Sequence, residues 1–316
     1  MIDVLLGAWI AVLPAQQPPV APPAPTPPQA LASPLTPEAQ QALQTQVMLD
    51  RAGFSPGEID GTMGGNTQRA LDAYQKASDQ PNAPRSDPLI RYHITDEDVA
   101  GPFTARIPDD LMAQAALPSL GYRNVVEALG ERFHASPALL HRLNPGAKFA
   151  AGEEILVPNV LGIVQPVGPP GAQTGGQNPA DVIVTVTRST SSMTVTDGSG
   201  HTLFYAPVTT GSEHDPLPIG EWKVVGVRRN PEFHYNPQLF WDAEPAHSKA
   251  TIKPGPNNPV GLVWIDISRP HYGLHGTPEP SKIGKTESHG CVRLTNWDAI
   301  KLASLVRPGS RVVFAE

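Results

Sequence analysis

One stretch of the sequence, residues 288–293, reads Ser-His-Gly-Cys-Val-Arg and contains Cys291, the only cysteine among 316 residues. A lone cysteine cannot form an intramolecular disulfide. A second stretch, residues 274–277, reads Leu-His-Gly-Thr and places His275 sixteen positions upstream of the cysteine. Glycines follow His275 and precede Cys291, so backbone groups can approach both side chains. Because an imidazole can accept the proton of a thiol, these residues favour a Cys/His acyl-transfer site.

The residues around these two stretches have the pattern of β-strands. Residues 182–186 are all Val, Ile or Thr, and residues 192–196 alternate before a tight turn that contains Asp197-Gly198. Only residues 296–306 have clear helical spacing in this half. Further runs typical of strands occupy residues 202–205, 221–227, 262–267 and 310–314. We therefore expect a mostly antiparallel sheet or sandwich with one late helix.

This half of the chain, residues 180–316, resembles the catalytic domain of bacterial L,D-transpeptidases. The His-Gly and Ser-His-Gly-Cys motifs carry the resemblance, together with flanking matches at Thr210-Gly211, Pro218–Trp222, Pro259–Gly261, Tyr272-Gly273, Ile283-Gly284 and Asp298. The resemblance implies that Cys291 is the nucleophile and His275 the general base. It also implies that the backbone carbonyl of Gly276 orients the histidine, which removes the need for an acidic third member.

The same resemblance suggests roles for neighbouring residues. His289 and Gly290, with Cys291, would present backbone amides to the tetrahedral oxyanion, where one donor is typically worth roughly 10²–10³ in rate. Arg293 is always charged and would position a carboxylate of the substrate. Three more residues are candidates for substrate binding: Tyr272, Ser288 and Asn296.

The implied reaction is acyl transfer on peptidoglycan stem peptides through a thioester, with loss of the terminal D-alanine. An amine of a second stem peptide would give a 3–3 crosslink, and a lysine of an envelope protein would give a tether. Two alternatives stay open, namely an L,D-carboxypeptidase that uses water and a catalytically inactive protein that binds the cell wall. The implied chemistry needs no cofactor and no metal.

A zinc site is the main chemical rival, because His271, His275, His289 and Cys291 are all potential ligands. The spacing of the first two histidines suits a helix, but Pro270 and nearby glycines disfavour a helix there. Structural zinc sites usually carry more cysteines, and the chain has no Cys-x-x-Cys pair. A buried structural thiol is the other alternative for a lone cysteine.

Two smaller units are expected before the catalytic half. Residues 37–80 resemble a helical peptidoglycan-binding repeat, with the turn Ile59-Asp60-Gly61 between two helical patterns. Residues 120–160 resemble the second half of a LysM module, and Leu120-Gly121-Tyr122 stands where an opening strand would be. Residues 81–119 lack a clear pattern and are expected to connect the two. Both resemblances imply binding to glycan strands, and a LysM-like scaffold without sugar binding is the competing interpretation.

The chain is therefore expected to be multi-domain, with a small all-α unit, a small α+β LysM-like unit and a C-terminal mainly-β domain. Residues 1–15 contain an apolar run that is too short to span a bilayer and resembles the core of an export signal. Residues 16–36 and 161–179 are rich in Pro and read as linkers. We expect a periplasmic or envelope protein without a lipid anchor, since no cysteine follows the apolar run. A net charge of −7 without a Lys/Arg-rich block argues against nucleic-acid binding.

Overall fold

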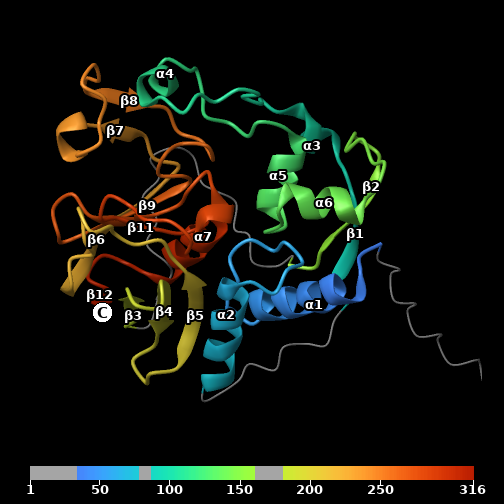
Figure 1. Ribbon diagram of the computed structural model, residues 1–316, viewed down its shortest axis with the longest axis horizontal. Helices are drawn as coiled ribbons and strands as arrows, with labels where there is room; N and C mark the ends of the chain where they lie inside the picture. The colour runs from blue at the N-terminus through green and yellow to red at the C-terminus, as the bar shows by residue number, and fades with distance from the viewer. Residues whose placement is uncertain (1–33, 78–86, 161–180) are drawn as a thin grey trace, which may run out of the picture. The chain divides into compact units, whose positions relative to one another are not determined.

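The computed structural model describes residues 34–77, 87–160 and 181–316 (Figure 1). The chain divides into two units, Met1–Ala30 and Leu31–Glu316, and every described element belongs to the second unit. The predicted export segment, almost all of the first linker and the linker at residues 161–179 lie outside the described residues. In the described ranges, no helix is both long and apolar enough to cross a membrane.

The first helical unit consists of α1 (Pro37–Arg51) and α2 (Gly65–Lys76). Helix α1 begins at Pro37, because the hydroxyl of Thr36 caps it and proline is favoured in the first turn of a helix. The buried side chain of Gln46 then ties the helix to the following turn. Its amide nitrogen donates to Asp60 Oδ1 at 2.9 Å, and its oxygen accepts the N–H of Gly61 at 2.8 Å. Gly61 has φ +69°, a conformation that favours glycine in such a turn.

The segment between the first helical unit and the large sheet, residues 87–160, contains a strand that the sequence did not reveal. Strand β1 (Leu89–His93) pairs antiparallel with β2 (Glu154–Pro158), and α5 (Val125–Arg132) and α6 (Pro137–Leu143) lie between them in the chain. Residues 120–122 form no strand. Strand β1 lies in the segment that was expected to be a connector, which also holds α3 (Asp96–Ala100) and α4 (Leu111–Ala115). The pairing joins residues more than 60 positions apart, so no local pattern reports it.

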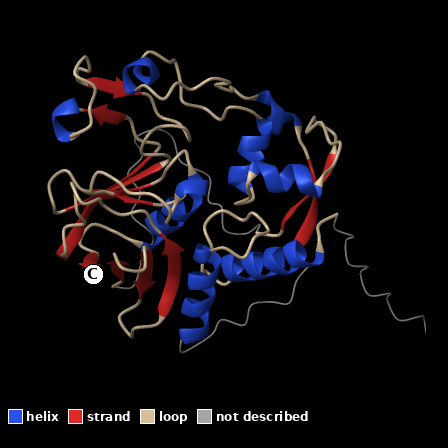
Figure 2. Ribbon diagram, in the orientation of Figure 1, coloured by secondary structure: helices blue, strands red, loops and turns tan. Residues whose placement is uncertain are grey.

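The C-terminal half forms one eight-stranded sheet in the order β11-β10-β9-β6-β12-β3-β4-β5. Figure 2 shows the strands of this half in red. The strands of the sheet are β3 (Ile183–Thr187), β4 (Ser192–Thr196), β5 (Thr202–Pro207), β6 (Gly220–Arg229), β9 (Val263–Ile267), β10 (Gly273–His275), β11 (Val292–Arg293) and β12 (Arg311–Ala315). All neighbours are antiparallel except the pairs β12–β3 and β10–β11.

The mainly-β expectation holds, but the strands make one curled sheet and not a two-sheet sandwich. Strand β6 explains the curl, because residues 220–223 pair with β12 and residues 224–229 pair with β9. A bulge between Val224 and Gly226 lies at the start of the second segment, and bulges bend a strand and increase its twist. Helix α7 (Asn296–Leu305) is the predicted late helix, and Ala299, Leu302 and Ala303 of this helix are buried in the core of the sheet.

Shorter elements complete the second half of the chain. Strands β7 (Phe233–Tyr235) and β8 (Ala250–Ile252) form a separate antiparallel pair, with the 3₁₀ turn η1 (Pro237–Leu239) between them. A second 3₁₀ turn, η2 (Pro280–Lys282), lies between β10 and β11. The helical units contact the C-terminal half at three places: α2 packs on β5, α5 on α7, and α4 on β8 (Figure 1).

Candidate active site

The two sequence motifs meet at one edge of the large sheet. Strand β10 carries His275 and pairs in parallel with β11, in a register that sets His275 opposite Arg293 and Leu274 opposite Val292. Cys291 directly precedes the first paired residue of β11. The sheet therefore brings the predicted nucleophile and the predicted base to neighbouring strands, although ten residues, 278–287, separate the two motifs in the chain.

His275 is a buried, neutral imidazole with a fixed orientation. Only 4% of the residue is exposed, and its ring stacks on Trp264 at 5.4 Å between centroids and 17° between planes. Its Nδ1 lies 2.7 Å from the carbonyl oxygen of Gly276. A carbonyl can only accept, so Nδ1 carries the proton and Nε2 keeps a lone pair. Burial, together with the charge of Arg293, lowers the pKa of His275 to about 3 and outweighs the opposing effect of the Gly276 carbonyl.

The thiol of Cys291 is partly buried and protonated at neutral pH in this state. Burial raises its pKa, while the N–H of Gly273 and the charge of Arg293 act in the opposite direction. Sγ lies 3.8 Å from the carbonyl oxygen of His271. Within the described ranges, no hydrogen bond joins this thiol to the ring of His275. A nearby group that takes the proton is therefore required before Cys291 can act as a nucleophile.

Ser288 and Gly290 shape the turn that leads to the cysteine. The hydroxyl of Ser288 donates to the carbonyl of Cys291 at 2.6 Å, and its N–H donates to the carbonyl of Thr210 at 3.0 Å. Ser288 is only 4% exposed, so its side chain serves the turn and does not face an open surface. Gly290 has φ +96°, and a Cβ there would lie 2.6 Å from the ring of Tyr272. The turn therefore requires glycine and packs Tyr272 against the motif.

His289 faces the segment between β7 and β8. Its Nε2 lies 2.8 Å from Oδ1 of Asp242, and its ring contacts those of Phe240 and Trp241 at 5.0 and 5.9 Å. The ring of His214 stacks on that of Trp241, with 4.4 Å between the ring centroids. The structure therefore places this aromatic segment against the Ser-His-Gly-Cys motif.

Asn296 was a candidate for substrate binding, but the structure places it in the interior of the protein. The residue has no exposed surface. Its Oδ1 accepts the N–H of Leu262 at 3.0 Å, and its Nδ2 donates to Glu131 Oε1 and to the carbonyl of Pro256 at 3.0 and 3.1 Å. The side chain is therefore committed to internal contacts.

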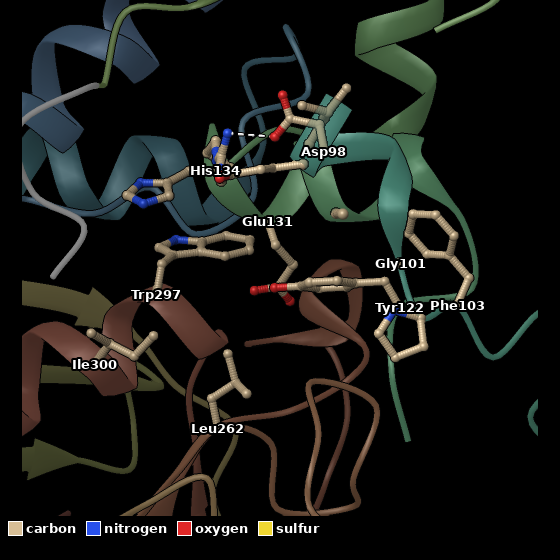
Figure 3. A pocket seen from close by; sticks show the side chains of 14 residues that line it. Asp98, Gly101, Phe103, Tyr122, Glu131, His134, Leu262, Trp297 and Ile300 are labelled. Carbon is tan, nitrogen blue, oxygen red and sulfur yellow. Dashed lines mark hydrogen bonds and ion pairs between the residues drawn. The ribbon is translucent and has the colours of Figure 1, made fainter. Parts of the chain in front are cut away.

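A cavity of about 450 Å³ lies where the helical units meet α7 (Figure 3). Glu131, His134 and Trp297 line it, and none of the predicted catalytic residues does. His134 stacks on Trp297 at 5.1 Å and forms a buried pair with Asp50, with 2.8 Å between Nδ1 and Oδ2. No motif surrounds His134, so its burial and its partner are visible only in the fold. In the part of the chain that the structure describes, no three His, Cys, Asp or Glu side chains converge so as to hold a metal ion.

Comparisons with known proteins converge on one family. The family model described as "L,D-transpeptidase catalytic domain" matches residues 181–314. "Putative L,D-transpeptidase YkuD" of Bacillus subtilis is 28% identical over 191 residues, which cover 60% of this chain and 92% of that protein. "Putative L,D-transpeptidase YqjB" of the same organism is 30% identical over 149 residues, 45% of this chain and 76% of the relative. "Probable L,D-transpeptidase YbiS" of Escherichia coli is 34% identical over 121 residues, 37% of this chain and 39% of the relative.

Proposed function

Because the chain belongs to the L,D-transpeptidase family, we propose that it transfers acyl groups between peptidoglycan stem peptides through a thioester on Cys291. The observation that carries the proposal is the state of His275. This ring is neutral, its Nδ1 proton is held by Gly276, and it lies on the strand next to Cys291. The lone pair of Nε2 is therefore free across the whole neutral pH range, so this nitrogen is available as the acceptor of the thiol proton.

The reaction begins when Nε2 of His275 takes the thiol proton of Cys291. The thiolate attacks the carbonyl carbon of the third stem residue, and the new C–S bond gives a tetrahedral oxyanion. Backbone amides of His289, Gly290 and Cys291 stabilise this oxyanion. When the oxyanion collapses, the C–N bond to D-alanine breaks and the imidazolium returns its proton to the leaving amine. A thioester remains on Cys291.

The second half of the reaction reverses these roles. An acceptor amine attacks the thioester, and His275 removes a proton from that amine. The C–S bond then breaks, and the imidazolium returns the proton to the thiolate of Cys291. An amine from a second stem peptide gives a 3–3 crosslink, and an amine from an envelope protein gives a tether. Water as the acceptor gives a shortened peptide and makes the protein an L,D-carboxypeptidase.

Arg293 serves both halves of the reaction in this proposal. Its guanidinium is partly buried, and burial lowers its pKa while the charge of Cys291 raises it. The positive charge favours the thiolate over the thiol. It also disfavours the imidazolium, so Nε2 of His275 is unprotonated at rest while the ring becomes a weaker base. A carboxylate of the stem peptide is a natural partner for the same guanidinium.

The remaining parts of the chain keep the enzyme on its substrate. The aromatic segment with Phe240 and Trp241 lies over the motif and would cover the bound stem peptide. The helical unit and the LysM-like unit would bind wall polymer and raise the effective concentration of stem peptides. A protein with this role acts outside the cytoplasm, in the periplasm or envelope.

Mass spectrometry tests the proposal directly. The full chain and its Cys291→Ala variant are incubated with a disaccharide-tetrapeptide. Wild type should show an adduct on Cys291 that lacks D-alanine, followed by a crosslinked dimer, and the variant should show neither. Release of tripeptide without dimer would identify a carboxypeptidase. An unchanged product yield from Cys291→Ala would overturn the proposal.

A further inference from the structure

The amide of Asn296 is packed against the backbone that carries the catalytic base. Its Oδ1 accepts the N–H of Leu262 at 3.0 Å. A Cβ on Gly261 or Gly276 would lie 2.0 or 2.2 Å from that same oxygen, so both positions exclude any larger residue. Asn296 thus lies between the turn before β9 and the residue after β10. Gly276 is also the residue whose carbonyl orients His275.

A residue from outside the catalytic half holds Asn296 from the other side. Glu131 lies in the last turn of α5, 165 positions earlier, and its Oε1 accepts from Asn296 Nδ2 at 3.0 Å. Its carboxyl group points into the cavity, between the rings of Trp297 and Tyr122 (Figure 3). Because Asn296 is fully buried, loss of this acceptor would leave an amide N–H without its partner and the amide freer to rotate.

Other contacts fix the end of α5 against α7 without involving Asn296. His134 follows α5, stacks on Trp297 and pairs with Asp50 at 2.8 Å. Ser55 of the first helical unit donates to Asp298 Oδ2 at 2.9 Å. The position of Glu131 is therefore set by a wider interface, and its own hydrogen bond is available for a more specific task.

We propose that Glu131 is a positioning residue for the catalytic base. It acts through Asn296 on the backbone of Gly276, and through the Gly276 carbonyl on the orientation and tautomer of His275. This inference rests on the proposed function, in which His275 is the base. The proposal means that α5, which precedes the catalytic domain in the chain, supplies part of the active-site architecture. Residues 181–316 alone lack this support.

The test compares three variants of the full chain. Glu131→Ala removes the acceptor, whereas Glu131→Gln keeps an oxygen that can accept from Asn296. Ser55→Ala is the matched control, since it removes another buried hydrogen bond to α7 that does not lead to Asn296. The readouts are the rate constant and KM of thioester formation, the melting temperature, and the nitrogen NMR signals of the His275 ring, assigned with His275→Gln.

Glu131→Ala should lower the rate constant of thioester formation about tenfold while KM changes little, as expected for a misplaced catalytic group. The His275 signals should lose the pattern of a single Nδ1-protonated tautomer. Glu131→Gln and Ser55→Ala should keep the rate within about twofold and leave the tautomer unchanged.

Two results would overturn the inference. One is a Glu131→Ala protein with the wild-type rate and tautomer. The other is an equal loss of rate in Glu131→Ala and Ser55→Ala, which would reduce Glu131 to a structural contact. Failure of the proposed function has a separate signature, because wild type would then form no thioester while the NMR readout still reports whether Glu131 positions His275.

Discussion

Two buried histidines, one in the catalytic turn and one at the interface with the helical units, have nearly the same surroundings. His275 is 4% exposed and stacks on Trp264 at 5.4 Å and 17°. His134 is 3% exposed and stacks on Trp297 at 5.1 Å and 9°. Each ring makes one short hydrogen bond through Nδ1, at 2.7 and 2.8 Å respectively. Burial, stacking and hydrogen-bond length therefore do not distinguish them.

The two rings differ in the charge of the group that faces Nδ1. Burial lowers the pKa of both rings, and at His275 the charge of Arg293 lowers it further while the neutral carbonyl of Gly276 offers limited compensation, so the pKa falls to about 3. At His134 the charge of Asp50 and its hydrogen bond outweigh burial, and the pKa is raised. A carbonyl partner thus leaves a neutral base, whereas a carboxylate partner makes a charged anchor.

Replacing each histidine by alanine should give opposite losses, and this is the largest expected effect. His275→Ala should slow thioester formation by roughly 10²–10⁴, because the thiol loses its base. His134→Ala should keep that rate within a few-fold and instead lower the free energy of unfolding. Single-turnover mass spectrometry and urea denaturation measure the two quantities. A His275→Ala protein within a few-fold of wild type would remove the base from the proposed mechanism.

The two motifs of the proposed active site could be found in the sequence because the parts of each motif are close together in the chain. The histidine and the carbonyl beside it are consecutive residues, and Ser288–Arg293 is a single run. The strand patterns predicted the mainly-β domain, and the helical spacing predicted its late helix α7. The bend of the sheet at β6 was not predicted, because it depends on the first part of this strand pairing with β12 and the second part with β9.

The interface could not be predicted in this way, because its contacts join distant residues. His134 and Asp50 are 84 positions apart, and Glu131 and Asn296 are 165 positions apart. Asn296 shows the consequence, since a polar residue beside a catalytic motif suggested substrate binding. Only the fold shows that its amide is buried and that its partner comes from another unit.

Changing the partner of His134 sharpens the comparison. Asp50→Ala leaves the buried ring without its counter-charge and should cost about 3–5 kcal/mol of unfolding free energy, the usual result of removing one member of a buried pair. Asp50→Asn supplies a neutral oxygen like that of Gly276, so the pKa of His134 should fall below its ordinary value. NMR titration of the His134 ring measures this. If the pKa stays raised in Asp50→Asn, the charge of the partner is not the deciding factor.

The pH dependence of stability gives a smaller effect with a defined sign. Burial raises the pKa of Glu131 to about 8 and those of Glu58 and Asp298 to about 7. A carboxyl group whose pKa is raised in the folded state stabilises the fold while it is protonated. This contribution is fully present below the unfolded pKa, near 4.5 or 3.8, and is lost as pH rises through the folded pKa of 7–8. The raised pKa of His134 acts in the same direction, and the lowered pKa of His275 opposes it only below pH 6.5.

The free energy of unfolding should therefore fall by at least about 3 kcal/mol between pH 5 and 8, which is the share expected from the buried Asp298 alone over the two pH units from 5 to 7. Urea denaturation at a series of pH values measures the slope. Asp298→Asn removes one of the titrating groups and should flatten the curve, whereas Glu316→Gln, at an exposed position, serves as the control. A stability that rises from pH 5 to 8 would contradict the assignment of these buried acids.

The smallest effect is expected at a third histidine, which also faces a carboxylate but lies near the surface. His289 pairs with Asp242 at 2.8 Å, and the carboxylate side chain is 46% exposed, so water screens the charge that is decisive at His134. Asp242→Asn should change the free energy of unfolding by less than about 1 kcal/mol. If the contact holds the aromatic segment over the motif, KM for the stem peptide should rise a few-fold while the rate constant of thioester formation is kept. A loss of that rate constant comparable with His275→Ala would instead give the exposed pair a part in the chemistry, and the charge of a partner would then matter at the surface as much as in the core.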